Sequence, residues 1–109
     1  MFFSQTNNEE HFVMSHFEDK LNPNSTTDEV LEAVEELLQE MISFQDRKLA
    51  KYARSIIPNL TDEDILQPHD FPLLDKNIRF QYEDGQLASL RGFLLAFRSR
   101  IVRKINTEM

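Results

Sequence analysis

The feature that most constrains this chain is a stripe of apolar residues that continues without a break from about residue 27 to residue 57. Its members recur at the spacing of an α-helix and, on a helical wheel, fill one face about 160° wide. A helix over this segment would be roughly 45 Å long. Because such a face must be buried against other elements, the segment predicts a helical bundle. The stripe consists of Val30, Leu31, Val34, Leu37, Leu38, Met41, Ile42, Leu49, Tyr52 and Ile56.

Both ends of this helix carry recognisable signals. Thr26 and Glu29 have the spacing of a capping box, in which each side chain accepts a hydrogen bond from the other residue's backbone N–H. Pro58 disfavours helical geometry in the residue before it, which predicts that the helix ends at Ile57. We therefore expect one long helix over about 27–57.

A second long helix is expected over about 85–105, beginning near Asp84 or Gly85. Its main stripe is Leu87, Leu90, Phe93, Leu94, Phe97 and Ile101, with Ile105 at its edge. A shorter helix is expected over 9–21 with Asn8 as its N-cap, after a flexible tail over 1–8. A further short helix is predicted after Thr61, which caps it, and ends before Pro68.

The segment 67–83 lies between these predicted helices and is long for a connection inside a compact domain. It is rich in apolar side chains, which predicts that it packs on the helices. These are Phe71, Leu73, Leu74, Ile78, Phe80 and Tyr82. The sequence thus predicts an all-α fold: a small helical bundle in a single domain over 1–109, built on two long helices with a packed connector.

Composition narrows the range of partners. The 109 residues carry a formal net charge of −7, which disfavours binding to phosphate backbones and to anionic lipid, so we expect no nucleic acid and no membrane as a partner. There is no cysteine, which excludes disulfides, a thiolate nucleophile and cysteine-ligated zinc and fits a cytoplasmic location.

Charge is segregated along the chain. The segment 28–40 holds six acidic residues and no basic one, whereas 91–104 holds five basic residues and no acidic one. Each block suits the dipole of its own helix end. Antiparallel packing of the two long helices would also bring the blocks side by side, which is the arrangement we expect. A phosphate-binding patch on the last helix is the alternative.

On the wheel of the last helix, Leu95 and Val102 form a second apolar pair beside the main stripe. Arg91 and Arg98 fall between the two, and the whole arc spans about 200°, more than one contact face requires. Arginines inside such an arc must reach the rim or meet carboxylates. Leu95 and Val102 could simply pack on the N-terminal helix, or the four residues could form the interface of a homodimer. We predict that these four residues form the interface of a homodimer.

Two patterns suggest metal chemistry. His69-Asp70 is similar to the adjacent His-Asp of metal-dependent phosphohydrolases, although that chemistry needs several further ligands. Glu32 and Glu35, with Glu36, resemble the ExxE element with which all-α nucleotide pyrophosphatases hold magnesium. These three lie opposite the apolar stripe, toward solvent, and the last helix is basic where a second acidic cluster would be needed. We expect no catalytic residue, no metal and no cofactor, and keep such an all-α hydrolase as the alternative.

The connector is the best candidate for contact with another protein. Long connections concentrate binding residues, and aromatic side chains dominate the energetics of interfaces. Phe71 and Phe80 could cover the protein's own core, which leaves Tyr82 with the polar residues His69, Lys76 and Arg79 as the predicted partner-binding set. The expected function is that of a non-catalytic protein–protein interaction module, acting as an adaptor, a chaperone-like protein or a regulator, and self-associating.

Overall fold

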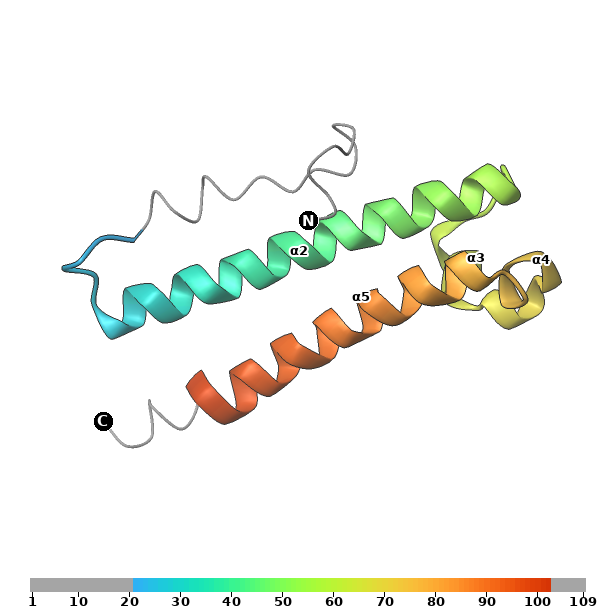
Figure 1. The fold of residues 1–109 in the computed structure, drawn as a ribbon. Coiled ribbons are helices and arrows are strands. Elements are labelled where there is room, and N and C mark those ends of the chain that lie inside the picture. The colour runs from blue at the N-terminus through green and yellow to red at the C-terminus, as the bar shows by residue number, and fades with distance from the viewer. Residues whose placement is uncertain (1–20, 103–109) are drawn as a thin grey trace. The chain divides into compact units, whose positions relative to one another are not determined.

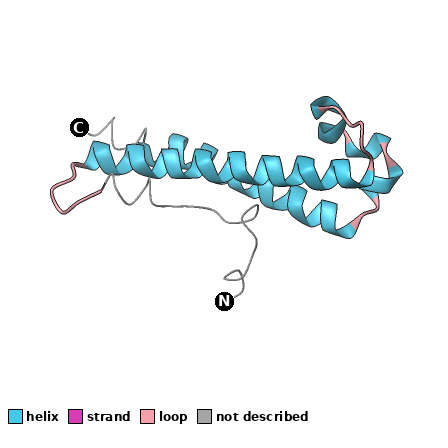
Figure 2. Ribbon diagram, turned by 90° about the horizontal axis from the view of Figure 1, so that it is seen from above, coloured by secondary structure: helices cyan, strands magenta, loops and turns pink. Residues whose placement is uncertain are grey.

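The computed structural model describes residues 21–102, which form helices and turns and no strand (Figures 1 and 2). The long helices are α2 (Thr27–Ile56) and α5 (Ile78–Ala96). Three short elements join them: α3 (Asp62–Leu66), the 3-10 turn η1 (Pro68–Asp70) and α4 (Pro72–Asp75). A π-helical turn, η2 (Phe97–Val102), follows α5. The predicted all-α bundle with two long helices is confirmed.

Parts of the prediction lie outside the described residues. The helix expected over 9–21 falls there except for Leu21, as do the tail expected over 1–8 and the expected end of the last helix at 105. The chain divides into two compact units, one of residues 42–93 and one of residues 1–41 with 94–109. The single domain expected over 1–109 stays a prediction.

The start of α2 is the capping box that the sequence predicts. The hydroxyl of Thr26 accepts from the backbone N–H of Glu29 at 3.1 Å, and the carboxylate of Glu29 accepts from the N–H of Thr26 at 2.8 Å. The last backbone hydrogen bond at its other end runs from the N–H of Ile57 to the carbonyl of Ala53. Pro58 therefore ends the helix within one residue of the predicted position.

The 42–93 unit has its own hydrophobic core. The centre of this core is formed by Phe80, Leu49 and Leu74, which come from α5, α2 and α4 and are almost fully buried. The short helix α3 is held by a second capping box, between Thr61 and Asp64, and buries Ile65 in the same core. The full buried set is Leu49, Ala53, Leu60, Ile65, Leu74, Phe80 and Leu87.

Within the 42–93 unit, α2 and α5 run antiparallel. Gln45 bonds to Glu83, whereas Tyr52, two turns further along α2, bonds to Asn77, which lies before α5. In the other unit, the Arg98 guanidinium lies 2.9 Å from the Glu35 carboxylate, so the acidic and basic blocks meet there as predicted. Lys104 lies outside the described residues.

The predicted start of the last helix near Asp84 or Gly85 is wrong, because α5 begins at Ile78. The cause is Asn77, whose side-chain oxygen accepts a hydrogen bond from the backbone N–H of Phe80 at 2.8 Å, as an N-cap does. Arg79, Phe80 and Tyr82 therefore lie on a helix and not in a connector. The true connection is shorter and consists mostly of single helical turns.

The far end of α5 also differs from its predicted wheel. Phe93 and Ile101 are exposed although both were placed on the buried stripe, whereas Val102 is half-buried. For Phe93 the predicted stripe was too wide. For Ile101 and Val102 the cause is η2: in a π-turn the hydrogen bond spans five residues, so Val102 replaces Ile101 on the side of buried Phe97.

Candidate functional site

The most distinctive surface of the described chain is the outward face of α5. It consists of Ile78, Tyr82, Gly85, Ser89 and Gly92, which we call the outer strip. Its members follow one another at alternating spacings of four and three residues and therefore share one side of the helix. All five are exposed, and two are large: the exposed fraction is 86 % for Ile78 and 62 % for Tyr82.

The glycines of the outer strip have no role inside the described structure. Neither has a positive φ, and a Cβ atom added to Gly85 or Gly92 would meet nothing within 4 Å. Glycine in the middle of a helix is nevertheless unfavourable compared with alanine. The helix therefore carries two destabilising residues that its own turn geometry and packing do not require.

The four charged side chains of α5 lie off the outer strip and either contact other residues of the 42–93 unit or line its groove. Arg79 stacks on the ring of Tyr52, with 4.5 Å from the guanidinium carbon to the ring centroid. Arg91 lies 3.9 Å from the carboxylate of Asp46, and Asp84 lines a groove between α2, α3 and α5.

The fourth charged residue, Glu83, is buried and fully satisfied. The Gln45 amide donates to its carboxylate at 2.6 Å and to its backbone carbonyl at 3.0 Å, and the Lys48 ammonium lies 3.6 Å from its second carboxylate oxygen. This network explains how a carboxylate is tolerated among apolar neighbours, since a buried charge without partners would be costly. It also fixes the register of α5 against α2.

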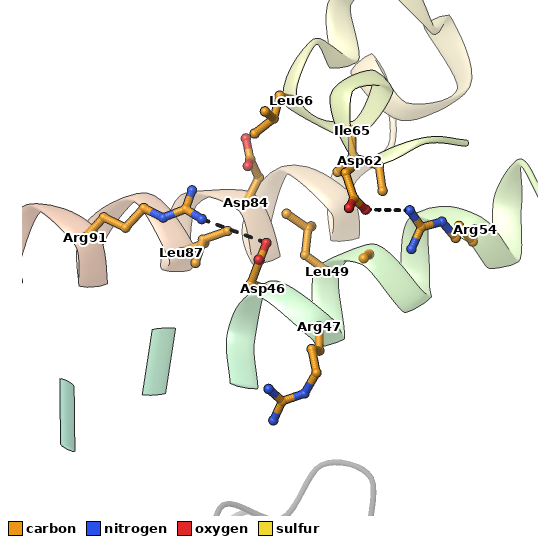
Figure 3. A pocket seen from close by; sticks show the side chains of 11 residues that line it. Asp46, Arg47, Leu49, Arg54, Asp62, Ile65, Leu66, Asp84, Leu87 and Arg91 are labelled. Atoms are coloured by element: carbon orange, nitrogen blue, oxygen red, sulfur yellow. Dashed lines mark hydrogen bonds and ion pairs between the residues drawn. The ribbon is translucent and has the colours of Figure 1, made fainter. Parts of the chain in front are cut away.

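The groove of this unit has a volume of about 390 Å³ (Figure 3). Its floor is apolar, formed by Leu49, Ala50, Ile65 and Leu87. At its rim, Arg54 bonds to Asp62 at 2.7 Å and to the carbonyl of Leu60 at 2.8 Å. Arg91, also at the rim, pairs with Asp46. A third arginine, Arg47, points away from the groove (Figure 3). The rim arginines are thus neutralised by aspartates of the same groove.

Of the four predicted partner-binding residues, two have contacts within the chain and two are exposed. His69 and Arg79 are engaged within the chain, His69 through a 2.9 Å contact between Nδ1 and the Asp75 carboxylate. Lys76 and Tyr82 are exposed, and the described residues offer Lys76 no ion pair. Ile78 was not among the predicted binding residues, because its place in the connector predicted core packing. The signal that could have identified it is the N-cap at Asn77: a helix that starts there places Ile78 one turn from Tyr82.

The four residues of the predicted oligomer interface belong to two different units. Arg91 belongs to the 42–93 unit and is paired with Asp46, whereas Arg98 belongs to the other unit and is paired with Glu35. Both arginines thus pair with carboxylates, as expected for charged side chains that lie between apolar residues. Leu95 is exposed, and Val102 lines a shallow hollow beside Leu31 and three acids of α2. An interface formed by these four residues stays a prediction.

The acidic residues that suggested metal chemistry are partly engaged elsewhere. Glu35 is half-buried and paired with Arg98, because α2 and η2 pack together in this unit. Within residues 21–102, no group of three or more His, Asp or Glu side chains is arranged to hold a metal ion. None of the helices in this range combines the length and apolar character needed to cross a membrane.

Comparisons with known proteins give no match: no protein-family model, no curated protein and no solved structure is significantly similar to this chain.

Proposed function

We propose that this protein is a non-catalytic protein–protein interaction module and that the outer strip of α5 is its contact surface. One observation carries the proposal: Ile78 and Tyr82, one helical turn apart, expose 86 % and 62 % of their surface while the core beside them is closed. Adjacent exposed apolar side chains of this size are typical of binding surfaces. Aromatic anchors such as Tyr82 contribute disproportionately to binding energy.

The neighbourhood of the strip supports the same proposal. Lys76 precedes Ile78 by two residues and would supply a polar rim, and the contact of His69 with Asp75 adds polar groups on the preceding elements. Adaptor, chaperone-like and regulatory roles all require such a surface. The proposal includes a cytoplasmic location, which the absence of cysteine favours.

Site-specific photo-crosslinking tests this proposal in the native host. A photoreactive amino acid at position 82 should give a discrete covalent adduct with a protein. The same amino acid at Ser43, an exposed position of α2 in the same unit, serves as the control and should give none. Equal labelling patterns at the two positions would refute the outer strip as the contact surface.

A second test uses substitutions. Tyr82→Ala and Lys76→Ala should each lower the yield of an adduct formed through position 78 without changing the melting temperature, since both side chains are exposed. Arg79→Ala is a poor test of binding because Arg79 stacks on Tyr52 and contributes to the fold. An adduct whose yield is unchanged by both substitutions would place the binding surface elsewhere.

A further inference from the structure

We infer that the protein bound by the outer strip is a second copy of this chain, with the two α5 helices antiparallel about a two-fold axis near Leu87. This inference rests on the proposed function and names its partner. Three features of the strip carry it: the absence of charge, the order of large and small side chains, and the two glycines.

Charge selects which face of this protein a second copy could approach. The chain carries a formal net charge of −7, so two copies repel one another over most of their surfaces. The outer strip holds no charged residue, and the charged groups of α5 contact other residues of the unit or line its groove. Pairing through the strip therefore buries no acid of either copy.

The order of side-chain sizes selects the orientation. Along α5 the large residues Ile78 and Tyr82 come first, and the small residues Gly85, Ser89 and Gly92 follow. In an antiparallel pair centred near Leu87, Tyr82 of one copy lies over Gly92 of the other. Gly85 then lies beside Ser89 of the other copy. Each large side chain meets a small one, as close packing requires, whereas a parallel pair would stack Tyr82 on Tyr82 and leave gaps at the glycines.

The glycines fit this arrangement and have no use in the isolated unit. Among residues 21–102, nothing lies within 4 Å of a Cβ added to either one, so their small size serves no contact within the described part of the chain. Small residues at a helix–helix contact let two backbones approach closely, which increases the van der Waals contact along the helices. The paired length, from Tyr82 to Gly92, is short, which predicts a dimer that dissociates in the micromolar range.

Sedimentation equilibrium of the purified full chain tests the inference. The mass of the wild type should rise from monomer to dimer with concentration, and Gly85→Glu should weaken the dimer at least tenfold. Glutamate favours the helix more than glycine does, so loss of the dimer would not reflect loss of the helix. The matched control Leu95→Glu, at an exposed position of the same helix off the strip, should leave the dimer unchanged. The reverse pattern would overturn the inference and favour the interface with Leu95 and Val102.

The orientation is tested by disulfide formation, because the natural chain has no cysteine. An oxidised mixture of Tyr82→Cys and Gly92→Cys proteins should give a covalent heterodimer. Tyr82→Cys alone should not, since an antiparallel pair holds its two copies roughly 15 Å apart along the helix. Efficient linkage of Tyr82→Cys to itself would overturn the antiparallel arrangement.

The two proposals fail in different ways. A strict monomer at several hundred micromolar, together with an adduct to a different protein at position 82 in the host, would refute the second copy and keep the interaction module. A monomer without any adduct at position 82 would refute both.

Discussion

The two faces of α5 belong to one helix and yet follow opposite rules of composition. The inward face is large and tightly filled: Phe80 and Leu87 are buried and Glu83 is satisfied by Gln45 and Lys48. The outward face is uncharged, holds two glycines, and leaves Tyr82 exposed. A helix whose far side only met water would be expected to carry charged and polar residues there. The composition of the inward face follows from folding, whereas the composition of the outward face is what the proposed contact with another molecule would require.

The sharpest test of this contrast compares one large aromatic residue from each face. Phe80→Ala should lower the free energy of unfolding by about 3–5 kcal/mol, because it leaves a cavity in a closed core. Tyr82→Ala should change it by less than about 0.5 kcal/mol at concentrations where the protein is monomeric. Chemical denaturation measures both. Similar losses in the two variants would show that Tyr82 belongs to the core and would break the comparison.

A smaller effect is expected at the polar part of the inward face. Gln45→Leu should cost about 1–3 kcal/mol, because the buried carboxylate of Glu83 loses its amide donor. Adding Glu83→Leu should recover most of that loss, since neither partner is then left unsatisfied. A double-mutant cycle followed by thermal and urea unfolding measures the coupling. Strict additivity of the two changes would show that the hydrogen bond contributes nothing to register or stability.

The boundary between connector and helix can be tested at Asn77. Asn77→Ala should cost about 1 kcal/mol, because the backbone N–H of Phe80 loses its cap and the hydroxyl of Tyr52 loses its acceptor. The control is Asn59→Ala, at an exposed position before α3, which should leave stability nearly unchanged. Equal stability of the Asn77 variant and wild type would mean that packing alone sets the start of α5.

The smallest expected effect has the opposite sign. Gly85→Ala should raise the stability of the monomer by about 0.4–1 kcal/mol, because the added methyl group meets nothing and alanine suits a helix better. At dimer-forming concentrations the same change should weaken association. Unfolding curves at low and high protein concentration separate the two effects. A loss of monomer stability would instead reveal an intramolecular role for this glycine.

Much of the fold could be predicted because its signals are local. The capping box at Thr26, the cap at Thr61 and the stop at Pro58 each depend on residues a few positions apart, and each is confirmed. The contact of Glu35 with Arg98 was predicted from the acidic and basic blocks of the sequence, which indicate pairing even between residues far apart in the chain.

The outer strip could not be predicted from local signals because it depends on the position of one helix boundary. A helix that starts near Gly85, as the sequence indicates, leaves Ile78 and Tyr82 in a connector, where their one-turn spacing has no meaning. The buried pair of Gln45 and Glu83 was missed for a different reason, since the sequence alone does not indicate which polar residues of two amphipathic helices will meet. The exposure of Ile101 was not predicted because no local sequence pattern marks a π-turn.

That π-turn has a consequence for how this helix tolerates change in length. A turn closed over five residues holds one residue more than an α-turn, so η2 is in effect a one-residue insertion accommodated without leaving the helix. Deletion of Ser99 would remove the surplus and return the segment to regular α-geometry. Relatives of this chain that differ by a single residue within Phe97–Val102 would therefore keep α5 intact and change only which side chains after Phe97 face α2.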